Sequence, residues 1–450
     1  MSVTVLENAA VSTVDAVGTE YARGHVVVDS GRIVAVGEGA APSGFSGERV
    51  DASGCLITPG LVNTHHHLYQ WATRGLAADS TLFQWLVHLY PIWGGLDAGI
   101  THAAATAGLA RLALTGCTTV ADHHYVFPAE GGDQLDALVS AVDRIGVRGH
   151  IVRGSMDRGE SAGGLPPDNL VEDTEAALLG TERAIDLHHD ASPDARVRIA
   201  VGPCSPFTVS EELMTGAAEL ARRRGVRLHT HLAETLDEQE QCLAETGLTP
   251  AEYAEKLGWL GEDVWFAHTV HLSPEAIRRL GATGTGSAHC PTSNGRLGTG
   301  IAPVRDLLDA GAPVGLGVDG AASNESGGLG EELHQSLLQA RQRGGPTALT
   351  VREALWLGTM GGARCLGRQD ELGSIEQGKL ADLAVWRLDG LAYAGITDPV
   401  AALVLGTTPP LARLLVGGRT VVSDGSLRTA DETAIADELR TVSARIREAR

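Results

Sequence analysis

Between residues 58 and 365, short apolar runs alternate with longer stretches that are rich in Ala, Leu, Glu and Arg. Apolar runs of this length, bounded by turn residues, are typical of buried strands, whereas the longer stretches are typical of helices. This alternation predicts repeated βα units around a parallel sheet, and eight such units close into a barrel. The predicted strand cores are LVNTHHH, TTVADHH, GHIVRGS, VRIAVGP, VRLHTHL, VWFAH, TGSAHC and VGLGVD. We therefore expect an α/β fold with a TIM-like (β/α)8 barrel over residues 58–365.

Both ends of the chain follow another pattern, in which short alternating strands are joined by glycine turns. The N-terminal part contains HVVVDSGRIVAVGEG, where VDSGR supplies the turn of a hairpin. The C-terminal part returns to this pattern in GKLADLAVWRL and ARLLVGGRTVVSDG. We predict that residues 1–57 and 366–430 meet in a small composite β-sandwich domain beside the barrel, and that residues 431–450 form a C-terminal helix.

The composition excludes several classes of function. The chain has 35 Lys and Arg against 56 Asp and Glu, a net charge of −21, which disfavours nucleic acid or an anionic membrane as the main partner. Its 6 cysteines are scattered without a C-x-x-C pair, which predicts reduced thiols. The N-terminus lacks a basic segment followed by a long apolar core, and no apolar stretch reaches membrane-spanning length. We expect a cytoplasmic protein that acts on a small neutral molecule.

Histidines and acids stand where several predicted strands end. In TPGLVNTHHHLYQ, His65 and His67 alternate along a strand and so share a face, while His66 points elsewhere. Such a triplet alone is equally compatible with a His-rich turn on the surface. His231 and Glu234 follow the strand of VRLHTHLAET, His268 ends VWFAH and Asp319 ends VGLGVD. Each residue singly is more simply structural, but a repeated placement at strand ends predicts one shared site.

This set can bind a metal and move protons. Three imidazoles and one carboxylate, from His65, His67, His231 and Asp319, suit zinc and would also accept ferrous iron. A metal held this way lowers the pKa of a bound water to about 7, which provides a nucleophile at neutral pH. Glu234 can shuttle protons, and His268 and Asp319 can orient the water and the substrate. The expected reaction is hydrolytic attack on an unsaturated carbon that bears nitrogen or oxygen.

Two features of the site stay open at this point. His229 and His231 are also two residues apart, and we favour His231 because it lies nearer the strand end and beside Glu234. We expect one metal per chain, because a common binuclear arrangement needs a modified lysine near the third or fourth strand. The only lysines are Lys256 and Lys379.

The motifs PGLVNTHHH, HTHLAET, FAHTVH and GLGVDG resemble those of the amidohydrolase superfamily, in its mononuclear zinc branch of deaminases. The likeness covers nearly the whole chain. Within the branch, NTHHHLYQ, ADHHYVFP, RGSM, GGLPP and PCSPFTVS are most similar to the 8-oxoguanine deaminases, a family that hydrolyses 8-oxoguanine to urate and ammonia. The resemblance implies Zn²⁺ on His65, His67, His231 and Asp319, a proton shuttle at Glu234 and a catalytic histidine at His268. We also expect a homo-oligomer, a dimer or larger.

The substrate contacts are less specific in the sequence. Gln70 matches a substrate-binding glutamine of purine deaminases in this branch, and Trp71, Arg153 and Cys204 lie near predicted strand ends. Trp85 and Tyr125 could also contact a flat ring, although a packing role is as good an explanation. Guanine deaminases carry a P-R-F stretch where this chain has Ser205-Pro206-Phe207, which argues against plain guanine.

Other interpretations remain. The alternatives are deamination of guanine, isocytosine, a pterin or a thioadenosine, or hydrolysis of a chloro- or amino-triazine. Triazine hydrolases are similar in ADHHYVFP and RGSM but replace the last aspartate of the motif set, whereas Asp319 is present here. The most remote alternative is a barrel without catalysis that serves as a scaffold.

Overall fold

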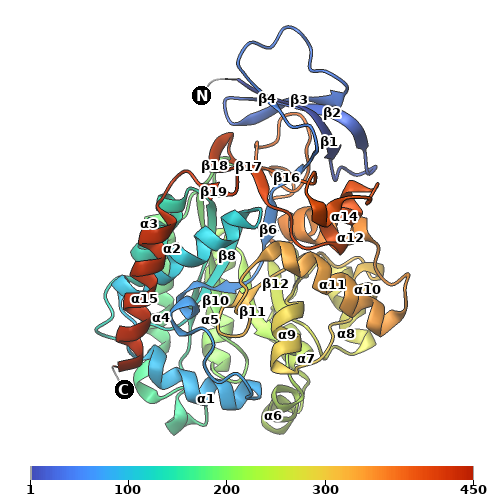
Figure 1. The fold of residues 1–450 in the computed structure, drawn as a ribbon. Coiled ribbons are helices and arrows are strands. Elements are labelled where there is room, and N and C mark those ends of the chain that lie inside the picture. The colour runs from blue at the N-terminus through green and yellow to red at the C-terminus, as the bar shows by residue number, and fades with distance from the viewer. Residues whose placement is uncertain (1–2, 449–450) are drawn as a thin grey trace.

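The computed structural model describes residues 3–448. Figure 1 shows two parts, a barrel of strands wrapped in helices and a sheet at one end of it that is built from both ends of the chain. The last helix, α15 (Glu432–Glu448), packs on the outside of the barrel against α2 (Ala98–Leu114). Residues 1–2 and 449–450, at the outer ends of two predicted ranges, lie outside the described residues.

Eight parallel strands close the barrel, as the alternating pattern predicts. In chain order they are β6 (Leu61–Asn63), β8 (Cys117–His124), β9 (Arg148–Ser155), β10 (Val197–Pro203), β11 (Leu228–Leu232), β12 (Val264–His268), β13 (Gly286–His289) and β14 (Val314–Leu316). Strand β12, VWFAH, is buried throughout, because the barrel interior covers one of its faces and the helices cover the other. The predicted fold class is therefore confirmed.

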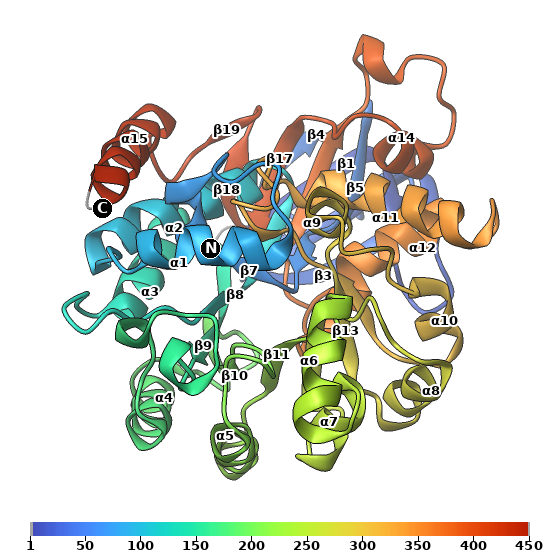
Figure 2. The same cartoon turned by 90° about the horizontal axis from the view of Figure 1, so that it is seen from below.

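Helices ring the outside of the barrel (Figure 2), and local sequence sets their ends. At α5 (Glu211–Arg224), Ser210 accepts a hydrogen bond from the Leu213 N–H, and Gly225 ends the helix at φ 66°. The other helices are α1 (Leu82–Trp93), α3 (Gln134–Ile145), α4 (Thr174–His188), α6 (Leu236–Thr246), α7 (Pro250–Lys256), α8 (Pro274–Thr283), α9 (Pro291–Leu297), α10 (Val304–Asp309), α11 (Leu329–Gly344), α12 (Val351–Trp356), α13 (Gly362–Cys365) and α14 (Pro399–Leu405). Short helical segments are η1 (Leu68–Thr73), η2 (Glu160–Ala162), η3 (Asp168–Leu170), η4 (Leu357–Gly361) and η5 (Leu391–Tyr393).

The two ends of the chain share one sheet of nine strands. Its members are β1 (Thr4–Ser12), β2 (Glu20–Asp29), β3 (Arg32–Glu38), β4 (Glu48–Asp51), β5 (Cys55–Pro59), β16 (Leu383–Arg387), β17 (Leu411–Val416), β18 (Arg419–Ser423) and β19 (Ser426–Leu427). The halves join where β5 pairs antiparallel with β16, and β5 then leads directly into β6 of the barrel. Residues 366–430 are not all β structure, because α14 lies in this range and packs against α11 and α12.

The end of the barrel near this sheet is filled by side chains. Trp265 of β12 is fully buried in a cluster with Cys365 and Leu366 at the end of α13, and its Nε1 donates a hydrogen bond to Thr64 O at 3.0 Å. The C-terminal ends of the strands lie at the opposite end, from which Figure 2 views the barrel. In barrels of this type the active site lies at the C-terminal ends of the strands.

No helix within residues 3–448 combines the length and the apolar character that crossing a bilayer requires.

Candidate metal centre and active site

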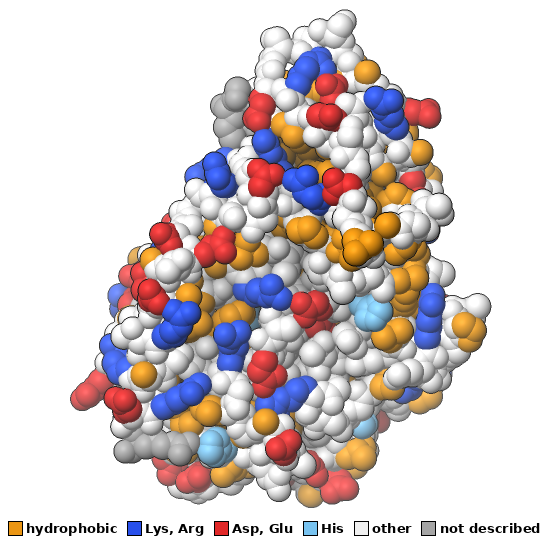
Figure 3. Space-filling model, in the orientation of Figure 1, with side chains coloured by type: hydrophobic (Ala, Val, Ile, Leu, Met, Phe, Trp, Pro, Cys, Tyr) orange, Lys and Arg blue, Asp and Glu red, His pale blue; other side chains and the backbone are white. Residues whose placement is uncertain are grey.

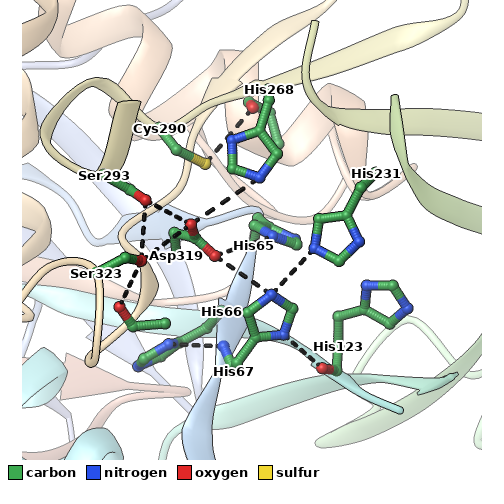
Figure 4. Close-up of polar contacts among 12 residues, drawn as sticks. His65, His66, His67, His123, His231, His268, Cys290, Ser293, Asp319 and Ser323 are labelled. Carbon is green, nitrogen blue, oxygen red and sulfur yellow. Dashed lines mark hydrogen bonds and ion pairs between the residues drawn. The ribbon is translucent and has the colours of Figure 1, made fainter. Parts of the chain in front are cut away.

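The four side chains predicted as metal ligands lie together at the C-terminal end of the barrel (Figure 4). Nε2 of His65 and Nε2 of His67 lie 3.3 and 3.2 Å from Oδ1 of Asp319. Nε2 of His67 lies 3.1 Å from Nε2 of His231. All four residues are buried, the most accessible of them being His231 at 9% exposed. Three ring nitrogens and one carboxylate oxygen therefore face a single point.

The His triplet does not lie on one continuous strand. Strand β6 ends at Asn63, and a separate strand β7 (His66–His67) pairs with β15 (Asp319–Gly320). The ladder breaks because the Asn63 side chain accepts the hydrogen bond of the Val318 N–H at 2.9 Å. His66 points away from the cluster and accepts a hydrogen bond from Trp71 Nε1 at 3.3 Å. The pairing of β7 with β15 brings His67 and Asp319 side by side from strands one and eight.

Hydrogen bonds behind the rings determine which nitrogen faces the site. Nδ1 of His67 lies 2.7 Å from His123 O, and Nδ1 of His231 lies 2.6 Å from Cys204 O. A carbonyl only accepts, so both rings carry their proton on Nδ1 and leave the Nε2 lone pair toward the site.

The same reasoning decides between His229 and His231. His229 Nδ1 lies 2.8 Å from Trp265 O and so is protonated, which makes His229 Nε2 the acceptor of the 2.8 Å hydrogen bond from His65 Nδ1. His229 therefore holds the ring of His65, and His231 is the residue of strand β11 that faces the site. His123 also lies close by, but its Nε2 is bonded to Gly202 O at 2.8 Å.

The donor set fits a metal cation. Nε2 of His65 is buried and has no hydrogen-bond partner among the described residues, although it faces a carboxylate. Burial lowers the pKa of His65 and of His231 well below the ordinary value, and neighbouring imidazoles act in the same direction for His231, so both rings are neutral as metal ligands must be. Burial acts to raise the pKa of Asp319, but the close approach of His65 and His67 outweighs it, so the pKa lies well below its ordinary value and the carboxyl is ionised.

Glu234 and His268 lie beside this centre. Burial, followed by the charges of Asp319 and Glu238, raises the pKa of Glu234 well above its ordinary value. His268 Nε2 lies 3.6 Å from Glu234 Oε2 and 3.9 Å from Asp319 Oδ2, and its Nδ1 lies 2.9 Å from Asn294 Oδ1. Glu234 Oε1 has no hydrogen-bond partner within residues 3–448. A carboxyl that holds a proton readily thus faces the site with a free oxygen.

The backbone is strained at the same place. Asp319 and His268 have φ angles of 61° and 71°, in the left-handed region that non-glycine residues rarely adopt. Ala233, which precedes Glu234, and Thr269, which follows His268, have φ angles of 53° and 48°. Such strain persists only where the surroundings enforce it, and it clusters at functional sites. The strained backbone therefore lies at the residues that position the predicted catalytic side chains.

A pocket with about 420 Å³ of space, part of which is open to solvent, opens onto the centre. Of the predicted residues, it is lined by His67, Gln70, Cys204, His231, Glu234, His268 and Asp319, together with Trp85 and Tyr125. Leu82 and Leu86 of α1, with Tyr90 and Leu297, add an apolar wall that the sequence did not predict. The only available signal was the amphipathic spacing of α1, which does not say what the helix covers.

Gln70 stands at the polar edge of this pocket. Its Oε1 is buried without a hydrogen-bond partner among the described residues. Gly320 makes room for it, because a Cβ at position 320 would lie 1.8 Å from that oxygen. The pocket therefore presents an unused acceptor to a bound molecule.

Two residues predicted as substrate contacts do not line the pocket. Trp71 packs on the far side of η1, with the Arg74 guanidinium 4.3 Å from its ring centroid. Arg153 pairs with Glu172 at 2.6 Å and lies 4.2 Å from the Phe127 ring centroid. Both residues have structural partners, so the structure gives no support to their predicted role as substrate contacts.

Comparisons with known proteins agree with this geometry. The model of a family described as the amidohydrolase family matches residues 56–421. The chain is 46% identical to a Pseudomonas aeruginosa protein named 8-oxoguanine deaminase, over 92% of this chain and 93% of that protein. It is 39% identical to an isoxanthopterin deaminase from an unidentified prokaryote, over 87% of this chain and 86% of the other. A crystal structure of atrazine chlorohydrolase from Arthrobacter aurescens, complexed with zinc, superposes with a TM-score of 0.93 at 34% identity, over 98% of this chain and 100% of that one.

Proposed function

The chain belongs to the amidohydrolase family, and from that premise we propose that it is a zinc-dependent aminohydrolase that converts 8-oxoguanine and water into urate and ammonia. The observation that carries the chemistry is the convergence of three imidazole nitrogens and one carboxylate beside a glutamate whose pKa is raised. The relative named 8-oxoguanine deaminase supports the choice of substrate.

One metal ion would be held by His65, His67, His231 and Asp319. When bound, it supplies the Lewis acidity that makes water a competent nucleophile near neutral pH. Ferrous iron would fit the same ligands, so metal analysis of the purified protein decides between the two.

Glu234 moves the protons. It accepts one proton from the attacking water and delivers it to the ring nitrogen beside the amino-bearing carbon, and it then passes the second to the departing amine, which leaves as ammonia. The raised pKa suits this task, because a strong acid would release the proton too early. Water thus supplies the oxygen of the product, and the C–N bond to the amino group breaks.

His268 and Asp319 orient the reacting groups. Asn294 fixes the His268 ring through Nδ1, so that Nε2 is directed toward Glu234 and Asp319. Asp319 Oδ2 accepts hydrogen bonds from Ser293 Oγ at 2.6 Å and from Ser323 Oγ at 3.2 Å. Both groups therefore keep their direction while the substrate changes geometry.

The pocket favours a free, uncharged heterocycle. No arginine or lysine stands among the described residues that line it. A substrate carrying phosphate would be left without a cationic partner, so a nucleotide does not suit the site. Trp85, Tyr90 and Phe207 offer apolar faces to a flat ring, while the unused oxygen of Gln70 can accept a ring N–H.

A substrate panel tests the proposal. Ammonia release is measured for the metal-loaded protein with 8-oxoguanine, guanine, isocytosine, isoxanthopterin, a thioadenosine and a chlorotriazine. We expect the highest kcat/KM for 8-oxoguanine, with urate formed in equal amount to ammonia. Faster turnover of isoxanthopterin would move the assignment to pterins, and faster dechlorination would move it to triazines.

A further inference from the structure

A second cavity lies at the other end of the barrel, around the N-terminal starts of β9, β10 and β11. It has about 550 Å³ of space, part of which is open to solvent, and its polar lining consists of His150, His189, Arg198 and Arg227. No carboxylate stands among the described residues that line it. Pro203, at the active-site end of β10, lies five positions beyond Arg198, which is roughly 16 Å of strand. The cavity is therefore separate from the metal centre.

Positive charge exceeds negative charge around this cavity. Arg198 and Arg368 share one carboxylate, Glu371, at 2.7 Å each. Arg227 has no ion pair among the described residues and donates through Nη2 only to the backbone carbonyl of Glu262. Arg198 and Arg227 line the cavity, and neither has a carboxylate of its own within ion-pair distance, although Asp263 and Glu262 act on the charge of Arg227 from farther away. Burial and then the charges of Arg198, Arg227 and Arg368 lower the pKa of His150 well below its ordinary value.

The guanidinium groups keep unused donors. Nε of Arg198 and Nε of Arg227 have no hydrogen-bond partner within residues 3–448. Nη1 of Arg227 lies beside Gly367, where a Cβ would come within 2.6 Å of it, so glycine at this lining position leaves the guanidinium room. The Arg227 guanidinium also lies 5.9 Å from the Trp265 ring centroid, which keeps it at the cavity wall.

This arrangement is unusual for an acidic protein. The face drawn in Figure 3 shows acidic and basic side chains intermingled, and the whole chain carries a net charge of −21. A cavity whose charged lining consists of arginines alone favours an anion as its occupant. Arginine pairs with oxyanions through two parallel N–H donors, which suits phosphate in particular.

We propose that the cavity between Arg198 and Arg227 binds one dianionic phosphate, either as inorganic phosphate or as the phosphate group of a small monoester. The two lining arginines and their unused N–H donors match the negative charge and the acceptor oxygens of such a ligand. The neighbouring cavity, lined by Arg32, Arg148, Arg196 and Arg419, suits it less, because Arg32 and Arg148 are already paired with Asp194 and Asp382.

Calorimetric titration of the metal-loaded protein with inorganic phosphate, in chloride buffer, tests the proposal. We expect one phosphate per chain and an affinity at least about tenfold weaker in Arg227→Gln, because a charge-assisted bidentate pair is lost. Arg419→Gln, in the neighbouring cavity, is the matched control and should bind as the wild type does. A parallel titration with glycerol 3-phosphate distinguishes the sources, since a site built for a monoester binds it more tightly than inorganic phosphate.

Several results would overturn the proposal. They are the absence of saturable binding, equal affinity in wild type and Arg227→Gln, and loss of binding in Arg419→Gln instead. Phosphate that binds only while the metal is present would sit on the metal centre, so the titration is repeated on metal-free protein, where we expect unchanged affinity. Circular dichroism checks the fold of Arg227→Gln, and Arg198→Gln provides a second variant with the same expected loss.

Discussion

Carbonyl and imidazole acceptors behind the site set the direction of each ring that we propose as a metal ligand. His67 and His231 are held by backbone carbonyls, and His65 is held by His229, whose other nitrogen faces Trp265 O. Such partners orient a ligand and raise its basicity, and their loss typically costs about 10- to 100-fold in metal affinity or activity. The residues behind the ligands are therefore part of the site.

A substitution at Glu234 distinguishes proton transfer from metal binding. Glu234→Gln should keep the metal and lose at least about 100-fold in kcat, because the amide cannot shuttle a proton. His231→Ala should lose both metal and activity, because it removes a ligand. Metal analysis and steady-state kinetics on both variants measure this, and Glu240→Gln, on α6, is the control. Full activity in Glu234→Gln would exclude the proton-shuttle role.

At this scale the sequence predicted which residues converge but not which way each side chain points. Gln70 and Trp71 are adjacent in η1, where successive side chains are about 120° apart, so one lines the pocket and the other faces outward. Arg153 follows Val152, which belongs to the interior cluster, and strand alternation places the arginine on the outer face. Neither direction can be read without knowing the helical segment or the register.

The contact between α2, β8 and the sheet depends on a glycine. Gly116 has φ 90°, and a Cβ there would lie 2.1 Å from the ring of Trp386, which is fully buried in β16. Gly225, after α5, has φ 66°, and a Cβ there would meet no atom within 4 Å. A side chain at either position would therefore strain the backbone, but only a side chain at position 116 would also collide with a neighbouring residue.

Gly116→Ala should therefore destabilise the protein more than Gly225→Ala. We expect about 1 kcal/mol for the strain alone at position 225 and about 2 kcal/mol more at position 116 from overpacking. Urea unfolding of the two variants measures the difference. Equal losses would show that Trp386 yields to the added methyl group.

A buried carboxyl between helices makes stability depend on pH. Glu332 of α11 accepts hydrogen bonds from Thr292 N at 3.1 Å and from Asn324 Nδ2 at 2.8 Å, and burial raises its pKa from 4.5 to about 7. Between these values the folded state binds a proton that the unfolded state has lost, so stability falls as pH rises from about 4.5 to about 7. The contribution of Glu332 to this change in the free energy of unfolding is at most about 3 kcal/mol.

Glu332→Gln should remove this dependence, because the amide stays neutral at every pH. The free energy of unfolding in urea, measured at pH 5.5 and pH 8, should differ less in the variant than in the wild type. An unchanged difference would mean that Glu332 is already ionised in the folded protein at pH 5.5.

The sequence predicted the positions of the barrel strands better than the breaks within them or the side chains that cover the pocket. The eight strand cores predicted from apolar runs correspond to the eight barrel strands, because a strand buried on both faces leaves a clear apolar run. The break between β6 and β7 was missed, because it depends on a hydrogen bond from Val318, just after the neighbouring strand β14, to the Asn63 side chain. The apolar wall from α1 was missed for the same reason, since only the fold places this helix over the pocket.

For the whole molecule, two ends of one barrel present opposite surroundings. The C-terminal end holds a metal-binding set and a pocket without cationic side chains, whereas the N-terminal end holds a cavity whose polar lining is cationic or imidazole. Both lie in a chain with a net charge of −21. Removal of the metal should therefore abolish ammonia release while phosphate binding at the far end persists.

The central claim is that one metal, held by His65, His67, His231 and Asp319, drives hydrolytic deamination. Metal-free protein is titrated with zinc while ammonia release from 8-oxoguanine is recorded. We expect the rate of ammonia release to rise in proportion to added zinc, to stop rising at one equivalent per chain, and to stay near zero in His231→Ala. A plateau that needs two equivalents, or no ammonia at full loading, would contradict this claim.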